Sequence, residues 1–250
     1  MPSKGVTQDI VFASAPCASE HDKVAVHVPA TFDPTAPFVL CVFLHGMEGD
    51  LPFEDHIQKA IDQIATCPAN ALLVAPRFGS RVQAGAFEDG AGFSSFIAEL
   101  QATMPETAEA PIVLAAFSGG WRPLGAVLKG LQRPGNPLAD RVTGLLLLDS
   151  IYGPQSSAEI IAWQKARRAQ TALLSIYGRD TTDNAPAANR ALIEALKETG
   201  PVLTPPSWSE LKDFPPGMVA FFEVATPHLD IVRDGPPAAP IAAFLDLLAE

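Results

Sequence analysis

Residues 111–121 read PIVLAAFSGGW and join an apolar segment to a helical one. The first six residues carry aliphatic and β-branched side chains and no charge, which is typical of a buried strand. Beyond the glycines, apolar residues recur at helical spacing: Leu124, Val127, Leu128 and Leu131. Ser118 is therefore predicted to lie on a sharp turn between a strand and a helix.

Small residues surround this serine at positions 116, 119 and 120. The pattern matches the nucleophile elbow G-x-S-x-G, with Ala116 in place of the first Gly. Larger side chains would collide with the backbone of so tight a turn. The free N–H of Gly119, at a helix start, could hold a developing oxyanion. The alternative interpretation is that Ser118 only caps the helix.

Composition narrows the class of protein. The chain has 250 residues, of which 48% are apolar, and a formal net charge of −11. Its basic residues are scattered, so we expect neither nucleic acid nor an anionic membrane as a partner. Neither a run of eighteen apolar residues nor an apolar leader is present, which favours a cytoplasmic protein. The three cysteines form no CxxC pair, so we expect no disulfide framework and no zinc cluster.

The order of the elements predicts one α/β domain over residues 1–250. Two leading strands are expected at 8–13 and 23–28. The valines at 24, 26 and 28 of the second strand alternate with other residues, as in a half-exposed edge strand. Six further strands, expected at 38–44, 71–75, 111–116, 142–148, 172–177 and 218–224, alternate with helices. The expected architecture is a mostly parallel eight-stranded sheet with helices on both faces. Residues 150–171 leave room for about one helix, hence for no large cap domain.

A serine nucleophile needs a base within hydrogen-bond reach and an acid that orients the base. His228 follows the last strand, and ligands of open α/β sheets bind beyond the carboxyl ends of strands. His228 is therefore the predicted base. His21 and His27 belong to the early strand, and His56 is expected to be solvated on the first long helix.

Two aspartates compete for the acid. Asp149 ends one strand, in LLLLDS, and Asp180 follows the next, in YGRD. Asp183 is a third candidate on the same loop as Asp180. Aspartate also commonly ends strands and caps turns, so the sequence leaves Asp149 and Asp180 equally open.

The loop after residues 38–44 reads His45-Gly46-Met47. It could supply a second backbone N–H to an oxyanion, from Met47, with Gly46 allowing a close approach. Trp121 and Tyr152 are the aromatic residues best placed to contact a substrate. The acidic residues 48, 50, 54 and 55 are expected to form a solvated rim, because metal-ligand spacing is absent. No metal and no cofactor are expected.

The succession LHGMEG, AFSGGW, LLLLDS, YGRD and ATPHLD resembles the α/β-hydrolase superfamily, over residues 7–250. It is also similar to a group of small bacterial proteins of that fold. The resemblance implies Ser118 as nucleophile, His228 as base, an Asp as its partner, and the N–H groups of Met47 and Gly119 as oxyanion hole. The turn after residues 172–177 has Gly-x-Asp where Gly-x-x-Asp is commoner, which keeps Asp149 a candidate.

The expected function is hydrolysis of a small-molecule carboxylic ester or amide through an acyl-enzyme. Two alternatives remain open at this point. One is a catalytically inactive binding protein with the same fold, since fold does not fix function. The other is an acyltransferase that uses the same triad. The sequence specifies neither the substrate nor the oligomeric state.

Overall fold

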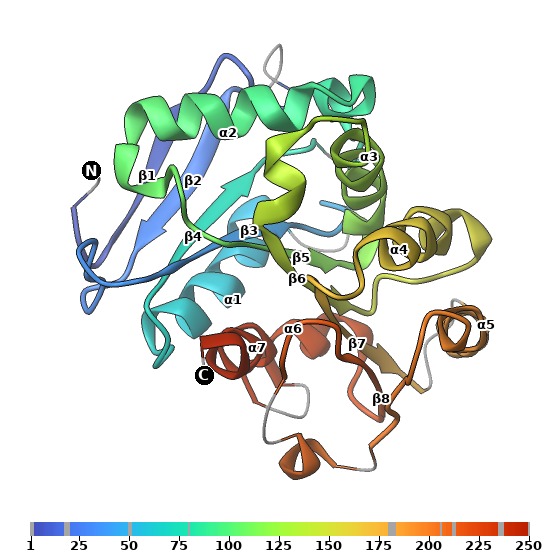
Figure 1. Ribbon diagram of the computed structural model, residues 1–250. Helices are drawn as coiled ribbons and strands as arrows, with labels where there is room; N and C mark the ends of the chain where they lie inside the picture. Colours follow the sequence, from blue (N-terminus) through green and yellow to red (C-terminus); the bar gives the residue numbers. More distant parts are fainter. Residues whose placement is uncertain are drawn as a thin grey trace.

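The computed structural model describes residues 3–17, 21–49, 52–79, 81–179, 184–205, 207–211, 214–234 and 238–249. These residues form a single sheet with helices packed on it (Figure 1). The strands are β1 (Val6–Val11), β2 (Lys23–Val28), β3 (Val39–Leu44), β4 (Ala71–Pro76), β5 (Ile112–Phe117), β6 (Val142–Leu148), β7 (Ala172–Gly178) and β8 (Val219–Val224). The α-helices are α1 (Phe53–Ala65), α2 (Gly92–Thr103), α3 (Trp121–Leu131), α4 (Pro154–Arg167), α5 (Ala185–Lys197), α6 (Ile231–Asp234) and α7 (Pro240–Ala249).

The eight-stranded sheet has the order β1-β2-β4-β3-β5-β6-β7-β8. Strand β2 runs antiparallel to both β1 and β4, and all other neighbours are parallel. The carboxyl ends of β3, β5, β6 and β8 therefore meet at the same edge of the sheet. This confirms the predicted mostly parallel eight-stranded sheet and gathers the loops that carry the candidate residues.

Helices cover both faces of the sheet, as predicted (Figure 1). One apolar cluster packs α2, α3, α4 and α5 against one face, and a second packs α1, α6 and α7 against the other. The central strands β4 and β5 are buried at every residue, because both of their faces are covered. The connection between β6 and β7, described throughout, holds the single helix α4, which leaves no large cap there.

Two details at the start of the chain differ from the prediction. The first strand runs from Val6 to Val11, two residues earlier than expected. Strand β2 is not a half-exposed edge, because five of its six residues are buried between β1 and β4. The edge strand is β1, whose Val11 is 61% exposed. The alternating valines face one apolar cluster, but alternation alone could not show that Ala25 and His27 would be covered from the other side.

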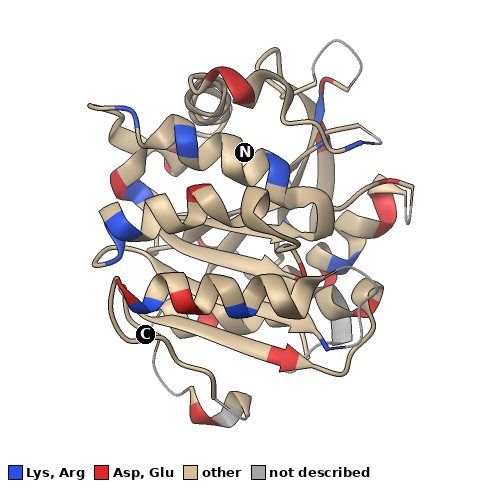
Figure 2. Cartoon of the chain, turned by 90° about the vertical axis from the view of Figure 1, so that its right-hand side faces the viewer, with Lys and Arg blue, Asp and Glu red and all other residues tan. Residues whose placement is uncertain are grey.

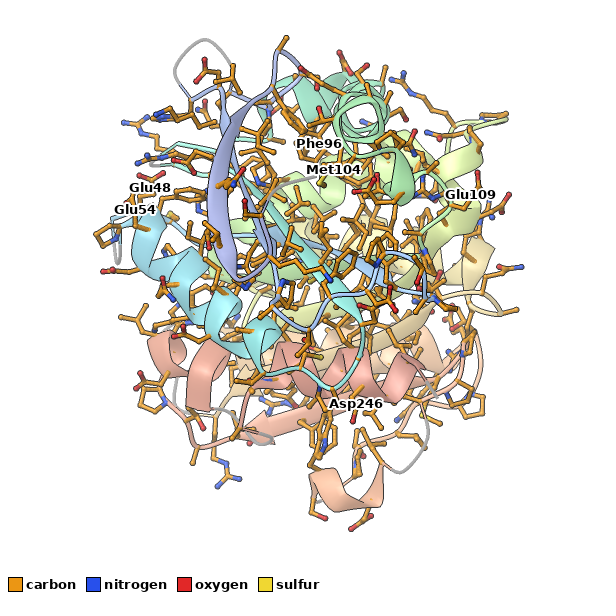
Figure 3. The ribbon with its side chains drawn as sticks, turned by 90° about the vertical axis from the view of Figure 1, so that its left-hand side faces the viewer. Glu48, Glu54, Phe96, Met104, Glu109 and Asp246 are labelled. Carbon is orange, nitrogen blue, oxygen red and sulfur yellow. The ribbon has the colours of Figure 1, made fainter. Side chains whose placement is uncertain are left out.

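Charged residues of both signs are interspersed over the side that carries α3, α4 and α5 (Figure 2). Phe96 in α2 and Met104 directly after that helix are fully buried, whereas Glu109 is exposed and Asp246 is half-buried (Figure 3). In the described part of the chain, no helix is long and apolar enough to cross a membrane.

The elbow glycine Gly120 is required by a close backbone approach. A Cβ atom at this position would lie 2.2 Å from the carbonyl oxygen of Leu44, which is backbone and cannot rotate away. Gly125, in the helix that follows, has room for a side chain. A Cβ atom there would come no closer than 3.8 Å to the side chain of Glu159, which is an ordinary van der Waals contact. The two glycines therefore differ in what an added methyl group would meet.

We expect Gly120→Ala to lower the free energy of unfolding by about 1–3 kcal/mol, the usual range for overpacking. Gly125→Ala is the matched control. It should stabilise the protein by about 0.5–1 kcal/mol, because Ala is favoured over Gly within a helix. Urea unfolding of the two variants and the wild type measures both changes. Equal stabilities of the two variants would contradict the close approach.

Candidate active site

Ser118 directly follows β5 and is 6% exposed. Its φ is +50°, a left-handed conformation that a residue with a side chain adopts at a cost of about 1–2 kcal/mol. Neighbouring contacts hold it there, since the hydroxyl of Ser150 donates a hydrogen bond to the Ser118 carbonyl oxygen at 2.9 Å. The turn thus presents the hydroxyl beyond the sheet edge instead of using it as a helix cap. Among the described residues, no side chain caps this helix start through a hydrogen bond.

His228 lies in a short 3₁₀ turn (His228–Asp230) after β8 and contacts two of the predicted residues. Its Nε2 is 2.9 Å from Oγ of Ser118, and its Nδ1 is 2.6 Å from Oδ2 of Asp149. Phe117 stacks against the imidazole with ring centroids 5.1 Å apart. An unbroken chain of hydrogen bonds therefore runs from a serine hydroxyl through an imidazole to a carboxylate.

Asp149 is the acid that the structure brings to His228. It follows β6, is fully buried, and has a φ of +44°. Its second oxygen, Oδ1, accepts a hydrogen bond from the Gly178 N–H at 3.2 Å. Both oxygens of this buried carboxylate thus have a partner. Asp180 and Asp183, the competing candidates, lie outside the described residues.

Tyr152 also reaches the nucleophile. Its hydroxyl donates to the Asp149 carbonyl oxygen at 2.6 Å and lies 3.4 Å from Oγ of Ser118. Trp121, the other predicted aromatic, is half-buried at the first position of α3, where its ring lies 5.0 Å from the Arg122 guanidinium carbon. Of the two aromatic residues singled out from the sequence, Tyr152 is the one in contact with the hydroxyl of Ser118.

The loop after β3 approaches the elbow closely. A Cβ atom on Gly46 would lie 3.0 Å from the Cβ of Ser118, and one on Gly119 would lie 3.5 Å from the backbone nitrogen of Met47. The Met47 side chain is 39% exposed and passes over Gly119. The backbone nitrogens of Met47 and Gly119 therefore belong to neighbouring segments beside the Ser118 hydroxyl. We call residues 45–48 the oxyanion loop, after the role that the sequence predicts for the Met47 N–H.

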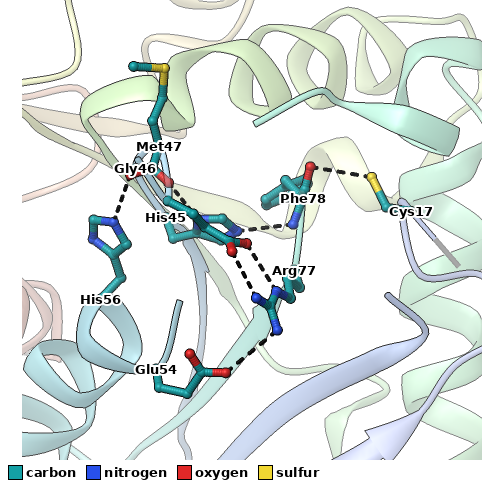
Figure 4. Close-up of polar contacts among 9 residues, drawn as sticks. Cys17, His45, Gly46, Met47, Glu54, His56, Arg77 and Phe78 are labelled. Atoms are coloured by element: carbon teal, nitrogen blue, oxygen red, sulfur yellow. Dashed lines mark hydrogen bonds and ion pairs between the residues drawn. The ribbon is translucent and has the colours of Figure 1, made fainter. Parts of the chain in front are cut away.

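His45 organises this loop from within the core (Figure 4). It is fully buried, and its Nε2 accepts a hydrogen bond from the Phe78 N–H at 3.0 Å. Its Nδ1 must then carry the proton and donate to the Gly46 carbonyl oxygen at 2.6 Å. Because the Gly46 carbonyl and the Met47 N–H share one peptide plane and point in opposite directions, this bond fixes the direction of the Met47 N–H. Burial lowers the pKa of His45 to about 4, so the imidazole is neutral at pH 7.

This lowered pKa predicts an acid-sensitive fold. Unfolded, His45 takes up a proton near pH 6.5, whereas the folded protein resists it until about pH 4. Its contribution to stability is therefore fully present above pH 6.5 and is lost as the pH falls toward 4. Between pH 7 and 4.5 we expect this group to account for a loss of about 2 kcal/mol. The measurement is urea unfolding of wild type and His45→Asn at both pH values. The fall in the free energy of unfolding between pH 7 and pH 4.5 should be larger in the wild type, and the difference between the two proteins is the contribution of His45. An equal fall in both proteins would contradict the prediction.

Two side chains around the oxyanion loop depart from the prediction. His56 is not solvated: it is 1% exposed, and its Nε2 lies 3.2 Å from the Met47 carbonyl oxygen (Figure 4). Glu48 is not part of a free acidic rim, because Arg77 binds it through two hydrogen bonds of 2.8 and 3.0 Å. The Arg77 side chain lowers the pKa of the Glu48 carboxyl. Glu54 lies on the same side and is 3.5 Å from Arg77 (Figures 3 and 4).

The described residues contain no group of three or more His, Cys, Asp or Glu side chains arranged to hold a metal ion. Cys41 and Cys67 are free thiols, and burial raises the pKa of Cys67 to about 11.

Solved structures with the same arrangement of elements include an esterase domain from a Rhodothermus marinus protein, with 12% identity, 96% of each chain covered and a TM-score of 0.58. The Thermogutta terrifontis esterase Est2 with bound butyrate has 13% identity, 89% of this chain and 85% of that one covered, and a TM-score of 0.56. The chain has the α/β-hydrolase fold. The same fold occurs in the poly(3-hydroxybutyrate) depolymerase LpqC of Bordetella parapertussis, with 12% identity, 96% and 89% of the two chains covered, and a TM-score of 0.55. No protein-family model and no curated protein matches the sequence.

Proposed function

We propose that this α/β-hydrolase-fold protein is a serine hydrolase that cleaves a small-molecule carboxylic ester or amide through an acyl-enzyme. The observation that carries the proposal is the hydrogen-bond chain Ser118–His228–Asp149, with distances of 2.9 and 2.6 Å. Both lie within the range for a nucleophile bound to its base and a base bound to its orienting acid.

In the first half of the reaction, Oγ of Ser118 attacks the substrate carbonyl carbon while Nε2 of His228 takes its proton. The tetrahedral intermediate collapses, and the same proton passes to the leaving alcohol or amine. Asp149 holds the tautomer of His228 that has its proton on Nδ1, and it stabilises the imidazolium that forms. In the second half, a water molecule attacks the acyl-enzyme by the same route and releases the acid.

The oxyanion hole would be formed by the backbone N–H groups of Met47 and Gly119. The short approach between these two segments and the His45 bond to the Gly46 carbonyl support this assignment. Donors fixed before the reaction stabilise the developing charge without having to reorganise, and each is worth about 10²–10³ in rate. The exposed Met47 side chain and Tyr152 would then contact the substrate on either side of the serine.

An ester is the favoured substrate within this proposal. Similar folds include esterases, one of which was solved phosphonylated by sarin, a reagent for activated serines. The fold likeness alone does not assign an activity at 12–13% identity, so the proposal depends on the geometry of the site.

The test is steady-state turnover of a panel of nitrophenyl esters and anilides of increasing acyl length. The proposal predicts hydrolysis of at least one ester with saturation kinetics. Adding an alcohol or amine nucleophile and analysing the products separates hydrolysis from acyl transfer. A folded protein that turns over no member of the panel would favour the alternative of a binding protein.

A further inference from the structure

Helix α1 carries three polar side chains on the face that it turns toward the protein: His56, Lys59 and Gln63. Their spacing of three and four residues places them in one row along the helix. His56 and Gln63 are 1% and 4% exposed, and Lys59 is half-buried. Burying polar groups is unfavourable unless they form hydrogen bonds. The hydrogen-bond partners of these three side chains therefore indicate their role.

The first member, His56, binds the oxyanion loop. Its Nε2 lies 3.2 Å from the Met47 carbonyl oxygen, and only a protonated nitrogen can make that bond, because a carbonyl only accepts. His45 holds the carbonyl of Gly46, the preceding residue. Two histidines, His45 of the loop itself and His56 of α1, thus bind the peptide groups on either side of the Met47 Cα (Figure 4).

The other two members bind the segment that carries His228. Nζ of Lys59 donates to the carbonyl oxygen of Leu229 at 2.5 Å, one residue after the base. Gln63 donates from Nε2 to the Val232 carbonyl oxygen in α6, and its Oε1 accepts from the Ile241 N–H of α7 at 2.7 Å. One side chain thereby joins the end of the base-bearing segment to the helix that closes the chain.

We propose that α1 is a shared positioning element, which holds the oxyanion loop and the His228 segment at a fixed distance from each other. The effect that we expect on kcat rests on the proposed function, whereas the hydrogen bonds of α1 to the two segments do not. His228 follows β8, whereas the oxyanion loop follows β3, and three strands of the sheet order separate these two strands. A rigid helix bonded to both segments sets their relative position independently of the intervening strands. Such sites need placement to within about 0.5 Å.

The three side chains act through backbone carbonyls of the two segments, so their removal should lower kcat with little change in KM. We expect His56→Leu to lower kcat by about 10- to 100-fold, the size of effect seen when a hydrogen bond that orients a ligand of a metal site is removed. His56→Gln keeps an N–H donor of similar reach and should recover kcat to within about fivefold of wild type. Gln58→Leu is the matched control, since Gln58 lies on the exposed side of α1 and donates to Asp62 of the same helix.

Amide hydrogen exchange tests the positioning without relying on activity. In His56→Leu, exchange should become faster in residues 45–49. In Gln63→Leu it should become faster in residues 228–232, whereas Gln58→Leu should change neither segment. If His56→Leu does not fold, Lys59→Met takes its place, with about tenfold lower kcat and faster exchange in residues 228–232 expected.

The proposal is overturned if exchange in both segments stays at the wild-type rate, or if His56→Gln loses as much kcat as His56→Leu. A wild-type protein without turnover would instead refute the proposed function. The exchange measurement would still decide whether α1 holds the two segments.

Discussion

Replacing Ser118 with Ala should abolish ester hydrolysis while the fold persists. The change removes only the oxygen that lies 2.9 Å from His228 Nε2 and adds no new contact. Loss of the nucleophile in a triad lowers kcat by about 10⁴- to 10⁶-fold, because the remaining groups cannot form an acyl-enzyme. The measurement is kcat/KM for the best ester of the panel, with circular dichroism to verify the fold.

Ser150→Ala is the matched control for this variant. It removes the hydroxyl of a serine in direct contact with Ser118, which donates a hydrogen bond to the Ser118 carbonyl oxygen. Since that hydroxyl supports the strained turn without taking part in the reaction, we expect a loss of about tenfold or less. If Ser118→Ala kept more activity than Ser150→Ala, Ser118 would not be the nucleophile.

The second large effect concerns the choice of acid. We expect Asp149→Asn to lower kcat by about 10³- to 10⁴-fold, as for an orienting aspartate in other triads. The new amide would present an N–H toward Nδ1 of His228, which favours the tautomer with its proton on Nε2. That tautomer cannot accept a proton from Ser118.

Asp180→Asn makes the same chemical change at the competing position. Asp149 already occupies Nδ1 of His228 at 2.6 Å, so the Asp180 variant should keep kcat within about threefold of wild type. A larger loss in Asp180→Asn than in Asp149→Asn would reverse the assignment and would mean that the imidazole changes partner during turnover.

The strands and the elbow could be predicted because their signals are local. An apolar run followed by Ser-Gly-Gly and a helical repeat specifies the turn at Ser118, and the structure shows why Gly120 is needed there. The choice between Asp149 and Asp180 could not be made in this way. Both follow strands, and the distance of each to His228 depends on loop paths that no local pattern encodes.

The environment of His56 shows a different limit. Its neighbour Asp55 and its position on a surface helix favour solvation. Yet His56 is three residues after Phe53 and four before Ala60, both buried, so the helical period already places it on the inner face. The helical period cannot predict the hydrogen-bond partner of His56, because the Met47 carbonyl belongs to the loop after β3 and not to the helix. The Arg77–Glu48 pair could not be predicted for the same reason.

The most direct test of the central claim, that Ser118 is an activated nucleophile, is reaction with a fluorophosphonate followed by intact mass spectrometry and peptide mapping. We expect one phosphonyl group per chain, located on Ser118. We also expect that Ser118→Ala is not labelled and that His228→Ala is labelled far more slowly. Equal labelling of wild type and Ser118→Ala, or a stable adduct on another residue, would contradict the claim.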